Sequence, residues 1–504
     1  MSEFLEKLKE MSDMTYTENG AVTNKSSGSD CLDFFASIGG MRNRDEQDII
    51  KYFIRAYAED PDKAMKLLFY TRDIRGGLGE RRIFRVILRW LAEYKSESVI
   101  INLPYIPEYG RYDDLLVLIG TRCEKNVIAM IKKQLTQDIE ALEKGEEVSL
   151  LAKWLPSVCT SNKEAVRTAK YLARSIGMSE AEYRKTLSKL RAAIRIIETK
   201  LCKKEYDFDY SKQCSKALYK YRKAFIRNDN ERYMKYIEDV NAGKTKMNTS
   251  TLMPYELVEP YLKRFMPNPW QTNRVQGLSA EETESLNTTW ANLPDYGSDE
   301  NMIAVIDTSG SMYWNETMPS PGAVALSLGL YIAERNRGAF ANHFIEFSFD
   351  AELIEIKGNT FADRLLYAAS LRKIANTDLE AVFKTILTTA LKYNMPQSEM
   401  PAKLIIISDM EFDFCVTNAG MTNFENAKKC YELHGYKLPE VIFWNVACRN
   451  RQVPVKKNEQ GVALVSGCTP LLFEMTAGGI VSPETFMEKI LSSERYKNIA
   501  AVSS

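Results

Sequence analysis

Apolar residues recur at intervals of three and four over most of the first half of the chain, from about residue 30 to residue 261. Stretches such as "DEQDIIKYFIRAYAED", "RRIFRVILRWLAEY" and "SEAEYRKTLSKLRAAIRIIETKL" show this spacing, which is typical of amphipathic helices. No strand-like alternation interrupts them, and Gly or Pro marks the short connections. The pattern predicts an all-α domain of HEAT-like helical repeats over residues 30–265, preceded by a flexible N-terminal segment, residues 1–29.

The pattern changes between residues 266 and 300, where Pro, Asn, Ser and Thr replace the periodic apolar positions, and we predict a linker there. After it, short apolar runs such as "MIAVID", "HFIEFS", "KLIIISD" and "EVIFWNVA" alternate with helical stretches. This alternation predicts a doubly wound α/β domain over residues 301–504, so the fold class is α + α/β. Asp307 and Asp409 end two of its predicted strands, where such folds bind ligands.

The composition is that of a folded globular protein. Apolar residues make up 45% and charged residues 27% of the 504 residues, which excludes a wholly disordered or collagen-like chain. The apolar runs are shorter than the roughly 18 to 20 residues that span a bilayer, and "MSEFLEKLKEM" lacks the apolar core of a signal peptide. The nine cysteines show no disulfide or zinc-finger spacing. We therefore expect a cytoplasmic protein with reduced thiols and no membrane partner.

The segment "DTSGS", Asp307 to Ser311, follows the first strand and carries the candidate chemistry. It lacks the lysine of a phosphate-binding P-loop and the glycine spacing of a dinucleotide turn. A serine hydrolase is disfavoured because the only histidines are His343 and His434 and no GxSxG elbow is present. The α/β context disfavours an aspartic protease. The alternating oxygens of Asp307, Ser309 and Ser311 favour a hard divalent cation, most simply Mg²⁺.

This D-x-S-x-S motif after a buried strand resembles the metal-ion-dependent adhesion site (MIDAS) of von Willebrand factor A (vWA) domains. The resemblance implies two further metal residues, Thr377 of "NTDLEAVF" and Asp409 of "IIISDMEFD". It also implies that the metal is a docking point to which a partner protein donates a carboxylate. Asp378 and Asp413 are nearby acids that are weaker candidates for tuning the metal or contacting a partner. The alternative that stays open is that the hydroxyl side chains only cap the following helices and that no metal binds.

The helical half resembles the helical module of TROVE-type ribonucleoproteins, the Ro autoantigen class, in which a vWA domain follows a ring of HEAT-like helices. The stretches that carry the resemblance are "RDIRGGLGERRIFR", "YGRYDDLL" and "KWLPS". They are also similar to an uncharacterised family with the same pairing of domains, and that relationship is the closer one. In the Ro class the ring binds structured RNAs on its outer surface and free RNA ends through its opening. The resemblance implies an RNA partner for this chain.

Basic clusters supply candidate RNA contacts, although the whole chain has a net charge of +0. Arginines surround the glycine turn of "RDIRGGLGERR", where guanidinium groups could converge on phosphates. "KALYKYRKAFIRNDNERYMKYI" interleaves basic residues with Tyr219, Tyr221 and Tyr233, a combination typical of single-stranded nucleic acid binding. The candidate RNA-binding residues are Arg72, Arg75, Arg81, Arg82, Lys216, Lys220, Arg222, Lys223 and Arg227. The alternative is a solvated helix face with tyrosines in the core.

Three functions follow from these patterns. The leading hypothesis is a non-enzymatic RNA-binding or ribonucleoprotein scaffold, in which the helical domain holds RNA and the vWA-like domain holds a metal and a partner. The second is a metal-dependent protein–protein adaptor without RNA binding. A metal-dependent hydrolase is disfavoured, because the metal site has no nearby histidine and no general base other than Asp378, Glu411 or Asp413.

Overall fold

The first half of the chain is helical, and residues 25–265, all of which are described, contain no strand. Helix α5 shows why: Ile83, Ile87 and Leu91 follow one another at intervals of four residues and are fully buried. The helices of this half are α2 (Asp30–Ile38), α3 (Glu46–Glu59), α4 (Pro61–Arg72), α5 (Arg81–Tyr94), α6 (Ser96–Asn102), α7 (Ile106–Tyr109), α8 (Glu124–Lys144), α9 (Leu151–Trp154), α10 (Lys163–Ser175), α11 (Glu180–Ile194), α12 (Ile197–Cys202), α13 (Ser215–Asn228), α14 (Asn230–Asn241), α15 (Pro254–Phe265) and α16 (Ala280–Ala291).

The second half is an α/β unit built on one six-stranded sheet, which agrees with the predicted α + α/β class. Its strands are β3 (Met302–Asp307), β4 (His343–Phe347), β5 (Ala351–Glu355), β6 (Lys403–Ser408), β7 (Glu440–Asn445) and β8 (Val462–Ser466), in the spatial order β5-β4-β3-β6-β7-β8. All neighbours run parallel except β4 and β5. The helices are α17 (Pro321–Arg335), α18 (Phe361–Ser370), α19 (Leu379–Tyr393), α20 (Asn423–Leu433), α21 (Leu471–Met475) and α22 (Pro483–Leu491).

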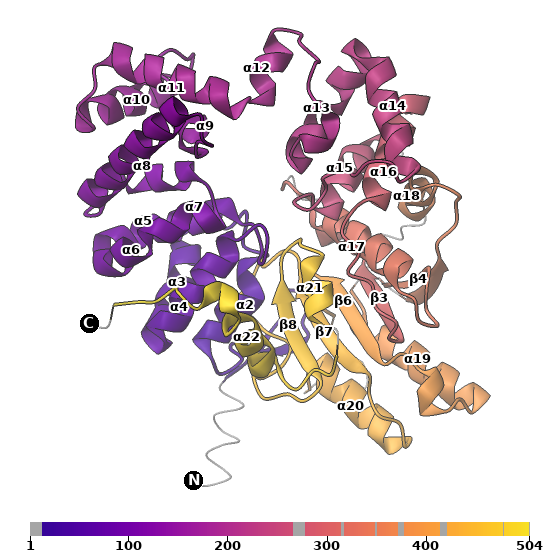
Figure 1. Ribbon diagram of the computed structural model, residues 1–504. Coiled ribbons are helices and arrows are strands. Elements are labelled where there is room, and N and C mark those ends of the chain that lie inside the picture. Colours follow the sequence, from indigo (N-terminus) through magenta and orange to yellow (C-terminus); the bar gives the residue numbers. More distant parts are fainter. Residues whose placement is uncertain are drawn as a thin grey trace.

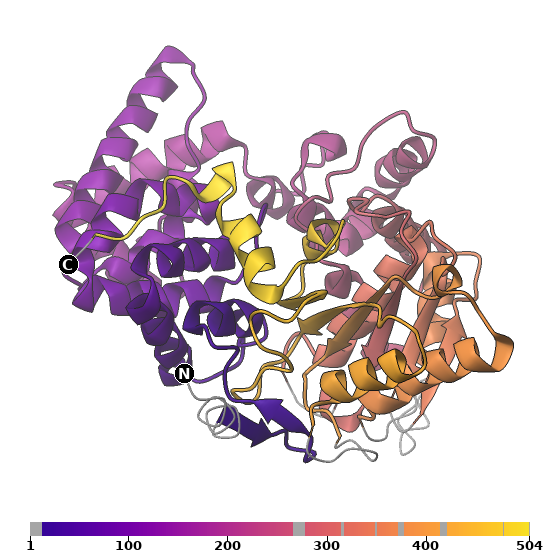
Figure 2. The ribbon, with the colours of Figure 1, turned by 90° about the horizontal axis from the view of Figure 1, so that it is seen from below.

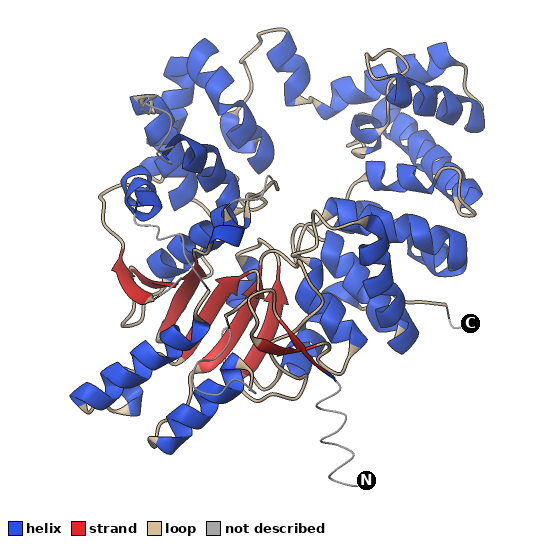
Figure 3. Cartoon of the chain, turned by 180° about the vertical axis from the view of Figure 1, so that it is seen from behind, coloured by secondary structure: helices blue, strands red, loops and turns tan. Residues whose placement is uncertain are grey.

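The helices of the first half form an arc whose two ends both meet the α/β unit, as the computed structural model in Figure 1 shows. Helix α2 packs against β8 and α22 at one end, and α15 packs against α17 at the other. In Figure 3, which views the molecule from behind, the sheet lies between the two ends of the arc. The structure describes residues 13–265, 278–313, 317–347, 350–370, 377–413, 421–476 and 478–502. None of the described helices is long and apolar enough to cross a membrane.

The N-terminal segment departs from the flexible tail predicted for residues 1–29. Strands β1 (Met14–Tyr16) and β2 (Val22–Asn24) form an antiparallel hairpin, whose turn depends on Gly20 at a φ of 88°. The hairpin is held by the far half of the chain, since Gly20 bridges to Asp413 and Asn24 bridges to Val453. Figure 2 shows both strands beside the loops of the α/β unit. The expectation of a flexible tail was wrong for residues 13–24, because contacts across some 400 residues leave no local pattern.

The predicted linker, residues 266–300, also contains a regular element. Helix α16 begins after Ser279, whose side chain accepts a hydrogen bond from the Glu282 amide. Its Trp290 ring stacks on Phe361 with ring centroids 3.8 Å apart, so this part of the linker belongs to the packed interior. Residues 266–277 lie outside the described residues. The polar composition of α16 concealed a helix whose C-terminal half is buried, including the polar residues Ser285, Thr288 and Thr289.

Candidate functional site

Asp307 and Asp409 lie at the point of the sheet where the strand order reverses. Asp307 is the last residue of β3, and Asp409 directly follows β6, the parallel neighbour of β3. From these two central strands the chain continues outward in opposite directions, to β4 and to β7. Ligands bind outside the carboxyl ends of parallel strands at such a reversal. The buried apolar runs of β3 and β6 therefore bring the two predicted carboxylates to one place.

Asp307 is fully buried and organises the loop that follows β3. Its Oδ1 accepts a hydrogen bond from the Ser309 amide at 2.9 Å, and its Oδ2 accepts one from the Ser408 hydroxyl at 2.6 Å. The hydroxyls of Ser309 and Ser311 lie 3.1 Å apart. Burial, and secondarily the negative charge of Asp409, raise the pKa of Asp307 to about 7. A positive charge at this point would relieve the cost of keeping Asp307 ionised.

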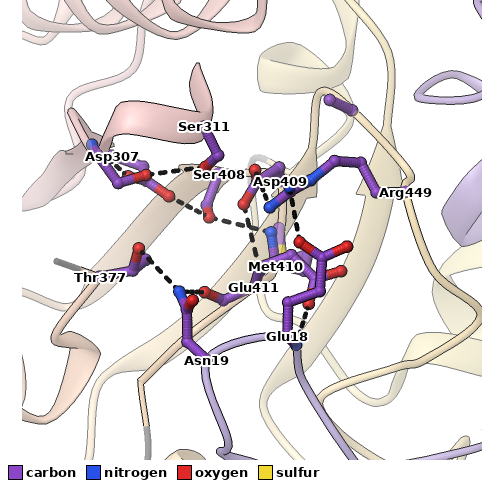
Figure 4. Close-up of polar contacts among 12 residues, drawn as sticks. Glu18, Asn19, Asp307, Ser311, Thr377, Ser408, Asp409, Met410, Glu411 and Arg449 are labelled. Atoms are coloured by element: carbon purple, nitrogen blue, oxygen red, sulfur yellow. Dashed lines mark hydrogen bonds and ion pairs between the residues drawn. The ribbon is translucent and has the colours of Figure 1, made fainter. Parts of the chain in front are cut away.

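Thr377 approaches the same strand ends from the loop before α19. Its amide donates to Asp413 Oδ2 at 3.0 Å, and the Asp413 amide donates to the Thr377 carbonyl at 2.9 Å. Figure 4 shows Asp307, Ser311, Thr377 and Asp409 gathered around the ends of β3 and β6. Asp378 caps α19 by accepting from the Ala381 amide, so its described contact is structural.

The two carboxylate oxygens of Asp409 have different partners. Its Oδ1 accepts from the Glu411 amide at 3.2 Å, whereas its buried Oδ2 accepts no hydrogen bond within the described part of the chain. That oxygen instead faces a guanidinium nitrogen of Arg449 at 3.0 Å, as an ion pair. Arg449 was not a predicted site residue, since nothing in "CRNRQ" indicates proximity to the metal motif.

The donor set fits a hard cation better than a soft one. It comprises the carboxylates of Asp307 and Asp409 and the hydroxyls of Ser309, Ser311 and Thr377, and oxygen ligands of this kind suit Mg²⁺. Across the residues that can be described, no group of three or more His, Cys, Asp or Glu side chains could hold a metal ion. A zinc-like site of cysteine and histidine is thus not supported. The Oδ2 atom of Asp409 already faces a positive charge, that of Arg449, and is compatible with a cation ligand.

The arginines of "RDIRGGLGERR" converge on carboxylates. Arg72 is buried and its Nε lies 2.8 Å from Asp114 Oδ2, while Arg81 lies 2.5 Å from Asp113. Asp113 and Asp114 belong to "YGRYDDLL", so two of the stretches that carry the family resemblance bind each other. The expectation that Arg72 contacts RNA is corrected, because its guanidinium is enclosed by protein. Arg81 also forms ion pairs with these two acids, although its side chain is partly exposed.

The glycine turn of this motif receives the C-terminal segment. A Cβ on Gly77 would stand 2.0 Å from the Tyr70 carbonyl oxygen, and one on Gly76 would stand 2.6 Å from the Arg495 side chain. Tyr496 donates to the Gly76 carbonyl at 2.9 Å, and Arg495 pairs with Asp73. Gly76 therefore permits the close approach of the C-terminal segment, whereas Gly77 lets the turn pack against Tyr70 of the arc.

The remaining candidate RNA residues are spread over several surfaces. Arg82 is exposed and donates to the carbonyls of Arg42 and Arg44 at 3.2 and 2.8 Å. Lys216 pairs with Glu256, and Lys223 pairs with Glu282. The others on α13 are the exposed residues Lys220 and Arg227.

Arg222 requires a correction as well. It is buried, stacks on the Tyr219 ring at 3.8 Å and donates to the Tyr261 hydroxyl at 2.8 Å. Tyr233 is buried too and shares a hydrogen bond with Ser285. These side chains form the interior around α13 and α14, which is the alternative that the sequence left open.

A different basic surface lies on the arc, with Arg75 as its one predicted member. A groove of about 890 Å³ is bordered by segments around α7, α9 and α12, which face the centre of the arc in Figure 1. Three acids line it, Glu108, Asp207 and Asp209, against twice as many basic residues. The basic residues are Arg75, Arg111, Lys153, Arg195, Lys200 and Lys212.

The groove also has a flat aromatic surface. The Arg111 guanidinium lies 4.0 Å from the ring centroid of Trp154, and the Lys153 ammonium lies 5.5 Å from it. Trp154 and Lys153 belong to "KWLPS", one of the stretches quoted for the resemblance, which was the available signal for this surface. No ion pair of Arg75, Lys153 or Arg195 occurs among the side chains that the structure describes.

Two families of unknown function account for almost the whole chain. One, described as "Domain of unknown function (DUF2828)", matches residues 17–127 and 123–296. The chain belongs to the DUF2828 family. A second, "Domain of unknown function (DUF7788)", matches residues 301–497 of this DUF2828 protein. The expected membership of an uncharacterised family is confirmed in this form.

Two individual proteins are similar to this DUF2828 member. The uncharacterized protein L728 of Acanthamoeba polyphaga mimivirus is 30% identical over 498 residues, which cover 91% of this chain and 83% of that protein. The crystal structure of the Ro (RSR) protein of Deinococcus radiodurans matches 92% of this chain and 99% of that chain, with 12% identity and a TM-score of 0.33. A TM-score this low does not establish a common fold.

Proposed function

We propose that this protein is a non-enzymatic RNA-binding scaffold, whose helical arc holds single-stranded RNA in the basic groove. The α/β unit, which we assign to the vWA class, binds a divalent metal at Asp307, Ser309, Ser311, Thr377 and Asp409 and docks a protein partner there. The proposal includes the assignment of the helical arc to the TROVE-like type, built from HEAT-like helices. The observation that carries it is the groove, which combines basic side chains with Trp154 on the inner face of the arc.

Single-stranded RNA matches the chemistry of this groove. Phosphates are attracted to the excess of cations, and Arg75, Lys153 and Arg195 have no described ion pair to give up first. Unstacked bases pack on aromatic rings and on guanidinium planes, and Arg111 and Trp154 provide both. Neighbouring α12 carries one further cation, Lys200, which pairs with Asp207 at 2.5 Å. A duplex would not present its base faces to such a surface.

The test is the salt dependence of RNA affinity, measured by fluorescence anisotropy with a labelled single-stranded RNA of about 20 nucleotides. The wild-type affinity should fall steeply between about 50 and about 200 mM salt, because phosphate neutralisation releases counterions. The triple variant Arg75→Ala, Lys153→Ala, Arg195→Ala should bind more than about tenfold more weakly, with a salt slope lower by about 2.

A matched control removes three exposed cations outside the groove, Lys51, Lys133 and Lys392, each replaced by Ala. The control should keep the wild-type affinity and slope. Equal losses in the two triple variants would contradict binding in the groove and would leave only a general effect of net charge.

The metal site favours a second function, a metal-dependent adaptor that acts without RNA. A bound Mg²⁺ would offer a position for a partner's carboxylate, and the protein supplies the oxygen donors at the strand ends. Its sign is capture of a partner that requires Mg²⁺, is lost in Asp307→Ala and survives treatment with ribonuclease. Capture that disappears with ribonuclease would favour the RNA scaffold instead.

A further inference from the structure

Arg449 links the candidate metal site to the N-terminal hairpin. One guanidinium nitrogen lies 3.0 Å from Asp409 Oδ2, and the other lies 2.7 Å from Glu18 Oε2. The loop that carries Arg449 follows β7 and is tied to the arc, since Arg44 donates to the Arg449 carbonyl. Figure 4 shows the arginine side chain between the two carboxylates.

The oxygen that Arg449 holds is the one that a metal ion would need. Asp409 Oδ1 is engaged by the Glu411 amide, so Oδ2 is the atom with capacity for a further strong interaction. The Asp409 side chain is 1% exposed and that of Arg449 is 32% exposed, so the guanidinium approaches a buried carboxylate from the solvent side. Two cations close to one buried carboxylate repel each other, and repulsion is strong where water is scarce.

The hairpin contacts other parts of the same site. The Glu18 amide donates to Glu411 Oε2 at 2.7 Å, and the Asn19 side chain donates to the Glu411 carbonyl at 2.6 Å. The same Asn19 nitrogen lies 3.5 Å from the hydroxyl of Thr377, another candidate metal residue. Asn450, next to Arg449, donates to Glu18 Oε1 at 2.7 Å. The Glu18–Asn19 turn therefore fixes Arg449 from one side and reaches the metal loops from the other.

We propose that Arg449 is an internal counterion of the metal site, which occupies Asp409 in the absence of a cation and is displaced when a divalent cation binds. After displacement, the Arg449 guanidinium stays paired with the Glu18 carboxylate in the turn of the N-terminal hairpin. The inference rests on the metal site of the proposed function and adds the residue that sets its affinity. Binding of the cation and the Arg449–Asp409 ion pair exclude each other, so each weakens the other by the same factor.

The test is a Mn²⁺ titration of the full-length protein, read as free Mn²⁺ by electron paramagnetic resonance. Arg449→Gln removes the competing charge and should tighten Mn²⁺ binding by about tenfold, equivalent to about 1.4 kcal/mol. Arg451→Gln is the matched control. It removes the same charge two positions along the chain from Arg449, and the Arg451 side chain pairs with Asp30 and Asp33. The control should bind Mn²⁺ within about twofold of the wild type.

Three results separate the outcomes. Wild-type protein that binds one Mn²⁺, lost in Asp307→Ala, with no tightening in Arg449→Gln, overturns the inference and leaves the metal site standing. Equal tightening in Arg449→Gln and Arg451→Gln also overturns it, because a general charge effect would then suffice. Absence of Mn²⁺ binding in the wild type and in Arg449→Gln overturns the metal site and the inference together.

A measurement on unmodified protein covers the case in which Arg449→Gln does not fold. Phenylglyoxal modifies accessible arginine side chains, and peptide mass spectrometry reports Arg449 and Arg451 separately. Saturating Mg²⁺ should speed the modification of Arg449 and leave the rate at Arg451 unchanged. An unchanged or slower rate at Arg449, in protein shown to bind the cation, would overturn the inference.

Discussion

The Nε atom of Arg72 lies 2.8 Å from Oδ2 of Asp114, and their side chains are 5% and 0% exposed. Asp114 also accepts from the Arg111 amide at 3.0 Å, and its other oxygen accepts from Arg85 at 2.5 Å. A buried carboxylate with this many donors is a fixed part of the interior. The pair joins α4 to the segment after α7 and lies beside Gly110 and Arg111, which line the basic groove.

Arg72→Ala should therefore destabilise the protein by about 3–5 kcal/mol, because it leaves the buried charge of Asp114 short of a partner. Arg75→Ala, three positions along, removes an exposed arginine and should change stability by less than about 0.5 kcal/mol. Chemical denaturation of both full-length variants measures the difference. Similar stabilities would show that the Arg72–Asp114 pair is dispensable for the fold.

Mg²⁺ should stabilise the wild-type protein against thermal unfolding. A ligand that binds only the folded state at about 100 times its dissociation constant adds about 2.7 kcal/mol. Asp307→Asn should respond much less, because it removes the carboxylate that organises the loop with Ser309 and Ser408. A thermal scan with Mg²⁺ and with a chelator makes the comparison. The metal assignment would fail if both proteins gained equally or neither gained at all.

The sequence predicted the strand ends well, because β3 and β6 are continuous apolar runs whose last polar residues must meet at one edge. It did not predict Glu18, Asn19 or Arg449. Their contacts join residues that are 392 or more positions apart in the sequence, and such contacts leave no periodic signal. The arginine motif misled for another reason. Charge density alone does not distinguish arginines that meet phosphates from arginines that meet Asp113 and Asp114.

Cysteine reactivity provides a footprint of the groove without any substitution. Burial raises the pKa of Cys31 and of Cys468 to about 12, so their thiols should resist alkylation at neutral pH. Cys159, Cys202 and Cys214 are exposed and should react. Only Cys214 among these three lines the basic groove.

Bound single-stranded RNA should therefore slow the alkylation of Cys214 and leave that of Cys159 unchanged. Iodoacetamide labelling followed by peptide mass spectrometry gives both rates in one sample. Equal rates at Cys214 with and without saturating RNA would place the RNA elsewhere on the protein.

The most direct measurement of the central claim is the nucleic acid that copurifies with the full-length protein, compared between the wild type and Arg75→Ala, Lys153→Ala, Arg195→Ala. The account predicts wild-type protein whose ultraviolet spectrum shows bound nucleic acid, released by high salt and digested by ribonuclease but not by deoxyribonuclease, and a triple variant that carries far less. Wild-type protein that is free of nucleic acid and ignores added RNA at low salt would contradict the account.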